Sequence, residues 1–322
     1  MPESLTLNTT HVRLLQWLRH YPFQRLEDLV VALGTWSGRT TIYTHLKELE
    51  RARLVEILRG PLCPGKRLYH LAPAGLAWYL VNTQTAASAP DAVALREALA
   101  SERAALLRMV PRVPAWLTLQ TAINGLVSGA ANTLTQQGHR ARLVQWNWQR
   151  DVLYAFTAQG HPMQWFADGV GAFCLRFAPA DGDVQECWYR FFLLYLPLTH
   201  LHLMRARLDR LLRWREAKER WLAYTQMPPI LILATSARQA EWWHEAAERV
   251  THKLGIIPPL GAVASLSSLT SEDREDTSPW AWAWKRLGSQ RMGHLRDVFA
   301  PNLILAFPTS FPRQRFPSSK TQ

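Results

Sequence analysis

The sequence predicts a mixed α+β protein made of at least two structural units. The chain of 322 residues is longer than one ordinary domain. Its 48% of hydrophobic residues can build a sizeable core. From about residue 116 onward, helical and strand patterns alternate, which is typical of a layered domain with a mixed sheet. A single small module and a wholly disordered chain are therefore excluded.

The first 80 residues predict three helices followed by two short strands. The helices are indicated by apolar positions three and four residues apart and the strands by alternation. The helices cover about residues 11–21, 24–33 and 39–53, and the strands cover 54–58 and 66–71. The Pro and Gly residues between the strands suit a tight connection. This order of elements is that of a winged helix-turn-helix.

The outward face of the third predicted helix carries hydroxyl and cationic side chains, which suit base edges and phosphates in a major groove. Cations beside the tip of the strand connection could reach the adjoining DNA backbone. The candidate DNA-binding residues are Arg39, Thr40, Tyr43, Thr44, Lys47 and Arg51 on the helix, with Lys66 and Arg67 on the wing. The alternative is that this polar face is simply solvated or mediates protein contacts.

The charge balance favours a polyanionic partner. There are 37 Lys and Arg residues against 25 Asp and Glu residues, which leaves a net charge of +12 that no single basic tail explains. No glycine-rich nucleotide-binding motif or nucleophile elbow is present, so we expect no cofactor and no nucleophilic catalysis. The three cysteines fit neither a disulfide framework nor a zinc site. With no secretory signal and no clean apolar span, we expect a cytoplasmic protein that does not enter a membrane.

Changes in composition divide the chain into four parts. Residues 8–82 form the predicted winged helix, and 83–115 form a linker with a helix from Ala92 to Val110 that ends at the prolines 111 and 114. Residues 116–262 form the layered domain, and 263–322 form a C-terminal extension whose basic end we expect to be mobile.

Within the layered domain the patterns predict three helices and four strands. The helices are 118–137, 201–226 and 237–254, and the strands are 141–148, 166–177, 187–198 and 228–236. The helix 201–226 carries seven cations, which either form a solvated face or touch a DNA backbone. Trp280, Trp282 and Trp284 would share one strand face, as core or as a platform for stacked bases.

This order and several short strings resemble the replication-relaxation proteins, a family associated with plasmid replication and DNA relaxation. The strings are FADGV at 166–170, YRFFLLYLPLTHL at 189–201 and PPILILATSARQAE at 228–241, behind the N-terminal helix-turn-helix. The resemblance covers roughly residues 10–260. It implies that the second domain has the core of PD-(D/E)XK restriction-endonuclease-like enzymes, with Asp168 and Gly169 as the strand-borne Asp-Gly of that core.

The resemblance also implies an acidic pair on the next strand, at positions that hold Leu194 and Leu196 here. Metal-dependent cleavage of a phosphodiester needs at least two carboxylates that converge on Mg²⁺. We therefore expect a nuclease-like scaffold without catalytic or metal-binding residues. Asp168 could instead be a hairpin-turn residue, since Asp-Gly is a strong turn signal.

Other candidate ligands are weaker. Asp181, Asp183 and Glu186 lack the spacing of a calcium loop and predict a polar turn. His200 and His202 would share a face on a strand but not on a helix, and no third ligand is evident.

The sequence thus predicts a protein of the plasmid replication-relaxation type that binds double-stranded DNA through its winged helix. The nuclease-like domain would serve as an assembly platform for replication or mobilisation proteins. Three alternatives remain open: a winged-helix transcriptional regulator, an active Mg²⁺-dependent nuclease using acids such as Asp181 or Glu186, and a pure interaction protein. The sequence gives no oligomeric state.

Overall fold

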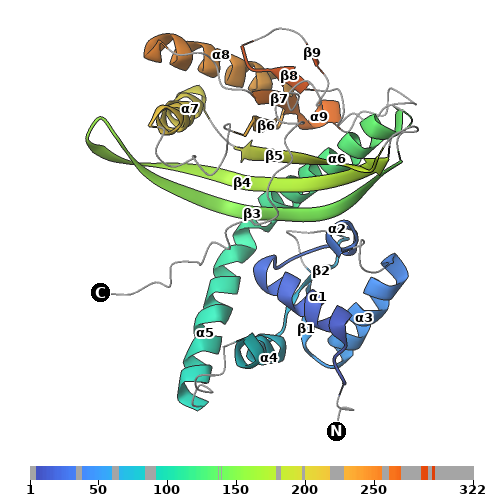
Figure 1. Cartoon of the computed structure of the whole chain (residues 1–322). Helices are drawn as coiled ribbons and strands as arrows, with labels where there is room; N and C mark the ends of the chain where they lie inside the picture. The colour runs from blue at the N-terminus through green and yellow to red at the C-terminus, as the bar shows by residue number, and fades with distance from the viewer. Residues whose placement is uncertain are drawn as a thin grey trace.

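The predicted mixed α+β class is confirmed by the computed structural model, in which a helical N-terminal unit lies against a mixed sheet covered by helices (Figure 1). The structure describes residues 5–33, 38–59, 65–83, 92–136, 138, 140–178, 183–197, 200–217, 228–255, 261–269, 284–288 and 292–293.

The N-terminal unit contains the three helices and two strands expected there. They are α1 (Thr9–His20), α2 (Leu26–Leu33), α3 (Arg39–Arg51), β1 (Val55–Leu58) and β2 (Leu68–Leu71). The strands pair antiparallel, and Leu15, Leu29 and Leu46 are fully buried between the helices. The unit therefore has its own apolar core.

A fourth helix, α4 (Pro73–Thr83), was not expected from the sequence. It begins with proline, which is tolerated in a first helical turn. A Cβ on Gly75 would collide with the backbone carbonyl of Leu54, so the helix approaches the segment before β1 as closely as only glycine allows.

The helix α5 (Ala92–Met109) is followed by a short 3₁₀ turn, η1 (Val110–Arg112), and by α6 (Val113–Gln136). The sequence assigned Pro114, with Pro111, to the end of the helix that begins at Ala92, but Pro114 lies in the next helix. Pro114 occupies the first turn of α6, where its missing N–H would have no partner within the helix in any case. The helix expected at 118–137 consequently begins five residues earlier.

Seven strands form one mixed sheet in sequence order. They are β3 (Arg140–Ala158), β4 (His161–Ala178), β5 (Gln185–Tyr195), β6 (Ile230–Ala234), β7 (Gly261–Ser265), β8 (Trp284–Arg286) and β9 (Met292–Gly293). The pairs β5–β6 and β6–β7 are parallel, and the other neighbours are antiparallel. The sheet continues past residue 262, where the sequence placed the end of the layered domain.

The interpretation of Asp168–Gly169 as a hairpin turn was wrong. Both residues lie inside β4, where Gly169 pairs with Arg150 of β3 and with Leu193 of β5. The turn between β3 and β4 is instead at Gln159 and Gly160, which both have positive φ values of 52° and 78°. A Cβ on Gly169 would collide with the Trp148 ring, so this glycine serves close packing inside the sheet.

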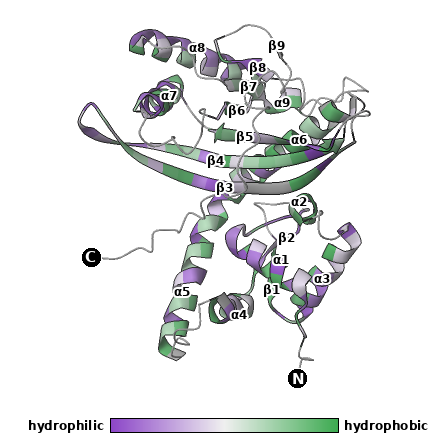
Figure 2. Ribbon diagram, in the orientation of Figure 1, coloured by the Kyte–Doolittle hydropathy of each residue, from purple (hydrophilic) through white to green (hydrophobic). Residues whose placement is uncertain are grey.

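The helices cover the two faces of the sheet. The helices α7 (Leu201–Glu216) and α8 (Ala237–Leu254) pack on one face, and α6 packs on the face that also meets the N-terminal unit (Figure 1). The short helix α9 (Leu266–Leu269) follows β7. The strand β6 is apolar and buried throughout. Figure 2 shows hydrophilic residues on α3 and α7. None of the described helices is long and apolar enough to cross a membrane.

Candidate nucleic-acid interface

The helix α3 has one buried and one exposed face. Ile42, Leu46 and Leu49 are fully buried against the rest of the N-terminal unit. The main contacts of α3 in the described chain are with α1, α2 and β1, and it lies on the side of the unit away from α4 and α5 (Figure 1). The sequence spacing therefore presents the polar face to solvent.

The predicted DNA-binding residues lie on this open surface. Tyr43 is half-buried, and the remaining members are exposed, namely Arg39, Thr40, Thr44, Lys47, Arg51, Lys66 and Arg67. The Thr44 hydroxyl donates a 3.0 Å hydrogen bond to the Thr40 carbonyl, which leaves its oxygen able to accept.

Three of these residues, two on α3 and one directly before β2, lie close together. The Lys47 ammonium is 4.8 Å from the centre of the Tyr43 ring. A hydrogen bond with Lys47, together with the charges of Lys47 and Arg67, lowers the pKa of Tyr43. Two cations and a phenol hydroxyl thus gather where α3 meets the hairpin.

The position of this surface is fixed by contacts between the N-terminal unit and the sheet. The Tyr21 hydroxyl donates a hydrogen bond to the Trp148 carbonyl on β3. The Arg150 guanidinium donates to the Pro22 carbonyl at 3.3 Å and lies over the Trp116 ring at 4.2 Å. Because these contacts join α1, α6 and the edge strand, α3 has a defined orientation relative to the sheet.

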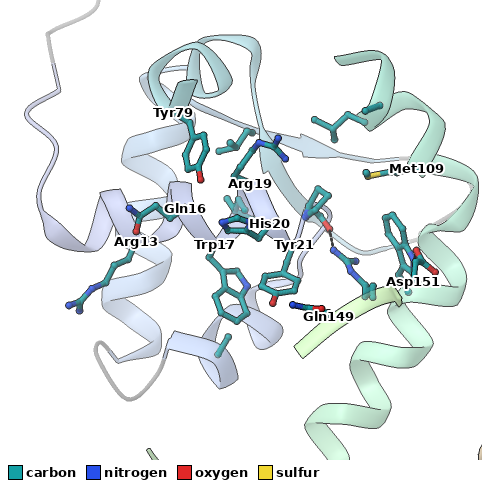
Figure 3. A pocket seen from close by; sticks show the side chains of 18 of the residues that line it. Arg13, Gln16, Trp17, Arg19, His20, Tyr21, Tyr79, Met109, Gln149 and Asp151 are labelled. Carbon is teal, nitrogen blue, oxygen red and sulfur yellow. Dashed lines mark hydrogen bonds between the residues drawn. The ribbon is translucent and has the colours of Figure 1, made fainter. Parts of the chain in front are cut away.

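A cavity of about 1220 Å³ lies beside this junction. Figure 3 shows side chains of α1, α4, α5 and β3 around it, including Trp17, Tyr79, Met109 and Gln149. Two buried donors of α1, Trp17 Nε1 and Arg19 Nε, line the cavity region and have no hydrogen-bond partner among the described residues. Burial lowers the pKa of the neighbouring Arg150 to about 10.

Asp168 is engaged in a structural ion pair. Its Oδ2 atom accepts hydrogen bonds of 2.7 Å from the Tyr195 amide and from Arg207 Nη2 of α7. Burial raises the pKa of Asp168, and the Arg207 charge opposes that shift only in part. Leu194, at one position where the resembled family has an acid, is fully buried among apolar side chains. Asp168 is thus held by a cation of the chain itself.

The other sequence candidates do not gather at one site. Glu186 forms an ion pair with Arg176, and Asp181 lies outside the described residues. The rings of His200 and His202 stack at 5.8 Å between centroids, because His200 is the extended N-cap of α7 and His202 lies in its first turn.

The sequence left open the role of the basic helix α7 and that of the three C-terminal tryptophans. Four of the arginines on α7 are half-buried and form ion pairs within the chain, so for these four neither a freely solvated face nor a contact with a DNA backbone is supported; they are Arg205, Arg207, Arg213 and Arg215. The segment 218–226 and both Trp280 and Trp282 lie outside the described residues. Trp284 is fully buried in the core of the sheet.

One polar cluster beside the interface was missed by the sequence analysis. His11 of α1 meets His45 and Glu48 of α3, with all three pairs of facing atoms within hydrogen-bond distance. The spacing of His45 and Glu48, three residues apart on a helix, was a local signal. The contribution of His11, 34 residues earlier, required the packing of α1 on α3.

Comparisons of the chain with family models, with curated proteins and with solved structures give no match. The resemblance to replication-relaxation proteins therefore rests on the residues quoted above.

Proposed function

We propose that this protein binds double-stranded DNA through a winged helix, in which α3 is the recognition helix and the β1–β2 hairpin is the wing. The observation that carries the proposal is the gathering of Tyr43, Lys47 and Arg67 on one open surface. A helix presenting hydroxyl and cationic side chains can enter a major groove, while a neighbouring wing contacts phosphates.

The electrostatics of the chain support the same partner. Lys47 and Arg67 form no ion pair with a carboxylate among those the structure describes, and the whole chain carries a net charge of +12. Cations that neutralise phosphates release condensed counterions, so binding of this kind weakens steeply as salt rises. Four arginines of α7, by contrast, are already paired within the chain.

The larger unit is proposed as an assembly platform of the plasmid replication-relaxation type, without nuclease chemistry. The absence of nuclease chemistry is supported by the ion pair between Asp168 and Arg207 and by the apolar surroundings of Leu194. A carboxylate that is paired with an arginine and raised in pKa is a poor ligand for Mg²⁺.

The test is a fluorescence-anisotropy titration of a labelled duplex over a range of salt from about 50 to about 200 mM. We expect Lys47→Ala and Arg67→Ala each to weaken binding and to reduce the salt slope by about one unit. Lys253→Ala and Arg249→Ala are the matched controls, because both residues are exposed on α8 beyond the sheet. No binding at low salt, or equal losses in the controls, would refute the proposal.

The cavity favours a second candidate function, a winged-helix transcriptional regulator that senses a small molecule. The cavity of about 1220 Å³ lies between the proposed DNA-binding unit and the sheet, where a ligand would touch both. A strong preference for one palindromic duplex over a scrambled one would favour this candidate over general duplex binding.

A further inference from the structure

The side chains of His11, His45 and Glu48 place three potential ligand atoms in a nearly equilateral triangle. His11 Nε2 and His45 Nδ1 are each 2.8 Å from Glu48 Oε2, and the two nitrogens are 3.0 Å apart. In the part of the chain that the structure describes, this is the one group of three such residues whose ligand atoms converge.

The size of the triangle matches one face of an octahedron. A metal ion about 2.1 Å from each of three ligands holds neighbouring ligand atoms about 3.0 Å apart in octahedral geometry and about 3.4 Å apart in tetrahedral geometry. The observed separations of 2.8, 2.8 and 3.0 Å are close to the octahedral value. Two imidazoles and one carboxylate on a face leave the opposite positions open for water.

We propose that His11, His45 and Glu48 bind a divalent transition-metal ion that joins α1 to α3. The imidazole ligands favour ions such as Co²⁺, Ni²⁺, Fe²⁺ or Zn²⁺ over Mg²⁺ and Ca²⁺, which prefer oxygen ligands. The site is accessible from solvent, because the side chain of Glu48 is 34% exposed whereas that of His11 is 3% exposed.

Without metal, hydrogen bonds explain how the cluster is held. The Asn8 amide donates to His11 Nδ1, which fixes the proton of neutral His11 on Nε2, where it points at Glu48. Hydrogen bonds from His45 and His11 lower the pKa of Glu48, because they stabilise its charged form.

Metal binding requires a change of tautomer at both histidines. The proton that His45 Nδ1 donates to Glu48 must move to Nε2 of the same ring. His11 Nε2 must likewise offer a lone pair, so its proton moves to Nδ1 and the hydrogen bond from the Asn8 amide is lost. The other bond of the capping box, from the His11 amide to Asn8 Oδ1 at 2.9 Å, is unaffected. The signature of occupancy is therefore a change at the Asn8 amide together with changes at His45 and Glu48.

The site lies on the side of the proposed recognition helix that faces α1. Glu48 directly follows Lys47, and His45 directly follows Thr44, both candidate DNA contacts. An ion between α1 and α3 would fix the recognition helix without touching DNA. The metal proposal stands on the cluster alone, so failure of DNA binding would leave it intact.

The experiment is a titration of the full-length, chelator-treated protein with CoCl₂ and with ZnCl₂, in competition with a fluorescent metal indicator. We expect one site per chain that is weakened at least tenfold by His45→Ala and by Glu48→Gln. Glu50→Gln, an exposed acid on the same helix, and His200→Ala, which removes the other histidine pair, should keep wild-type affinity. Amide NMR spectra with Co²⁺ should show paramagnetic effects centred on Asn8, His45 and Glu48.

Three results would overturn the proposal. They are wild-type metal affinity in both cluster variants, loss of the site in His200→Ala alone, and no saturable metal binding to the wild-type protein. If a cluster variant fails to fold by circular dichroism, the paramagnetic map of the wild-type protein decides, and effects centred away from His45 count against the site.

Discussion

The side-chain amide of Asn124 on α6 donates a 2.9 Å hydrogen bond to the carboxylate of Asp28 on α2. Asp28 is fully buried and also receives both the Arg25 guanidinium and the Arg25 amide. This carboxylate therefore links the proposed DNA-binding unit to the helix that covers the sheet, and its loss would affect the position of α3.

The hydrogen bonds and the ion pair of Asp28 are expected to stabilise the folded state. Asp28→Ala leaves Arg25 without its buried partner and should lower the free energy of unfolding by about 3 kcal/mol. Asn124→Ala removes one hydrogen bond to a charged group and should cost about 1.5 kcal/mol. Urea unfolding measures both, with the exposed neighbour Glu27→Ala as the control. Equal, small losses for all three variants would show that the network does not hold the two units together.

The Asp168–Arg207 pair is predicted to act as one unit. Each side chain is 12% exposed, and burial shifts the pKa of both groups against their charged forms, upward for Asp168 and downward for Arg207. Asp168→Asn or Arg207→Met alone should therefore cost about 3–5 kcal/mol, because each leaves one buried charge unpaired.

The double variant Asp168→Asn/Arg207→Met distinguishes this account from two independent contacts. We expect it to lose less stability than the sum of the two single variants in denaturant unfolding. Strict additivity would contradict a structural ion pair, and Mg²⁺-dependent nicking of DNA that disappears in Asp168→Asn would support the nuclease alternative instead.

The buried His244 is expected to make the protein less stable in mild acid. Burial, with a smaller effect of Lys285, lowers the pKa of His244 to about 4, below its usual 6.5. The native state thus binds fewer protons than the unfolded state between these values. The free energy of unfolding is therefore unaffected by His244 above pH 6.5. It falls by about 1.4 kcal/mol per pH unit as the pH drops from 6.5 toward 4.

The check is the pH dependence of urea unfolding in His244→Gln compared with the wild-type protein. Removing the titrating ring should flatten the curve between pH 6.5 and 4. His252→Gln, at an exposed position of the same helix, is the matched control. An identical slope in all three proteins would mean that His244 is solvated in the native state.

The sequence predicted the elements whose signals are local. The range of α8 was predicted without error, because Ser236 caps its first turn through the Gln239 amide and Gly255 ends it with a φ of 63°. The apolar spacing of α3 likewise predicted which side chains would be buried, namely Ile42, Leu46 and Leu49. Such features depend on residues within one or two helical turns of each other.

Features that depend on distant residues were not predictable in this way. Asp168–Gly169 reads as a turn locally, but pairing with β3 and β5 and contact with the Trp148 ring place it inside a strand. The pairing of Asp168 with Arg207, 39 residues away, is an ion pair that no local pattern of the sequence indicates. The cluster of His11, His45 and Glu48 also exists only once α1 packs on α3.

The central claim is that α3 contacts the duplex, and site-specific photo-crosslinking tests it most directly. A photoreactive phenylalanine derivative is introduced at Thr44, which is exposed on α3, or at Glu241, which is exposed on α8 across the sheet. The protein is then irradiated with a labelled duplex at low salt. We predict crosslinked DNA from position 44 and none from position 241. Crosslinking from position 241, or none from position 44 while the duplex remains bound, would contradict the account.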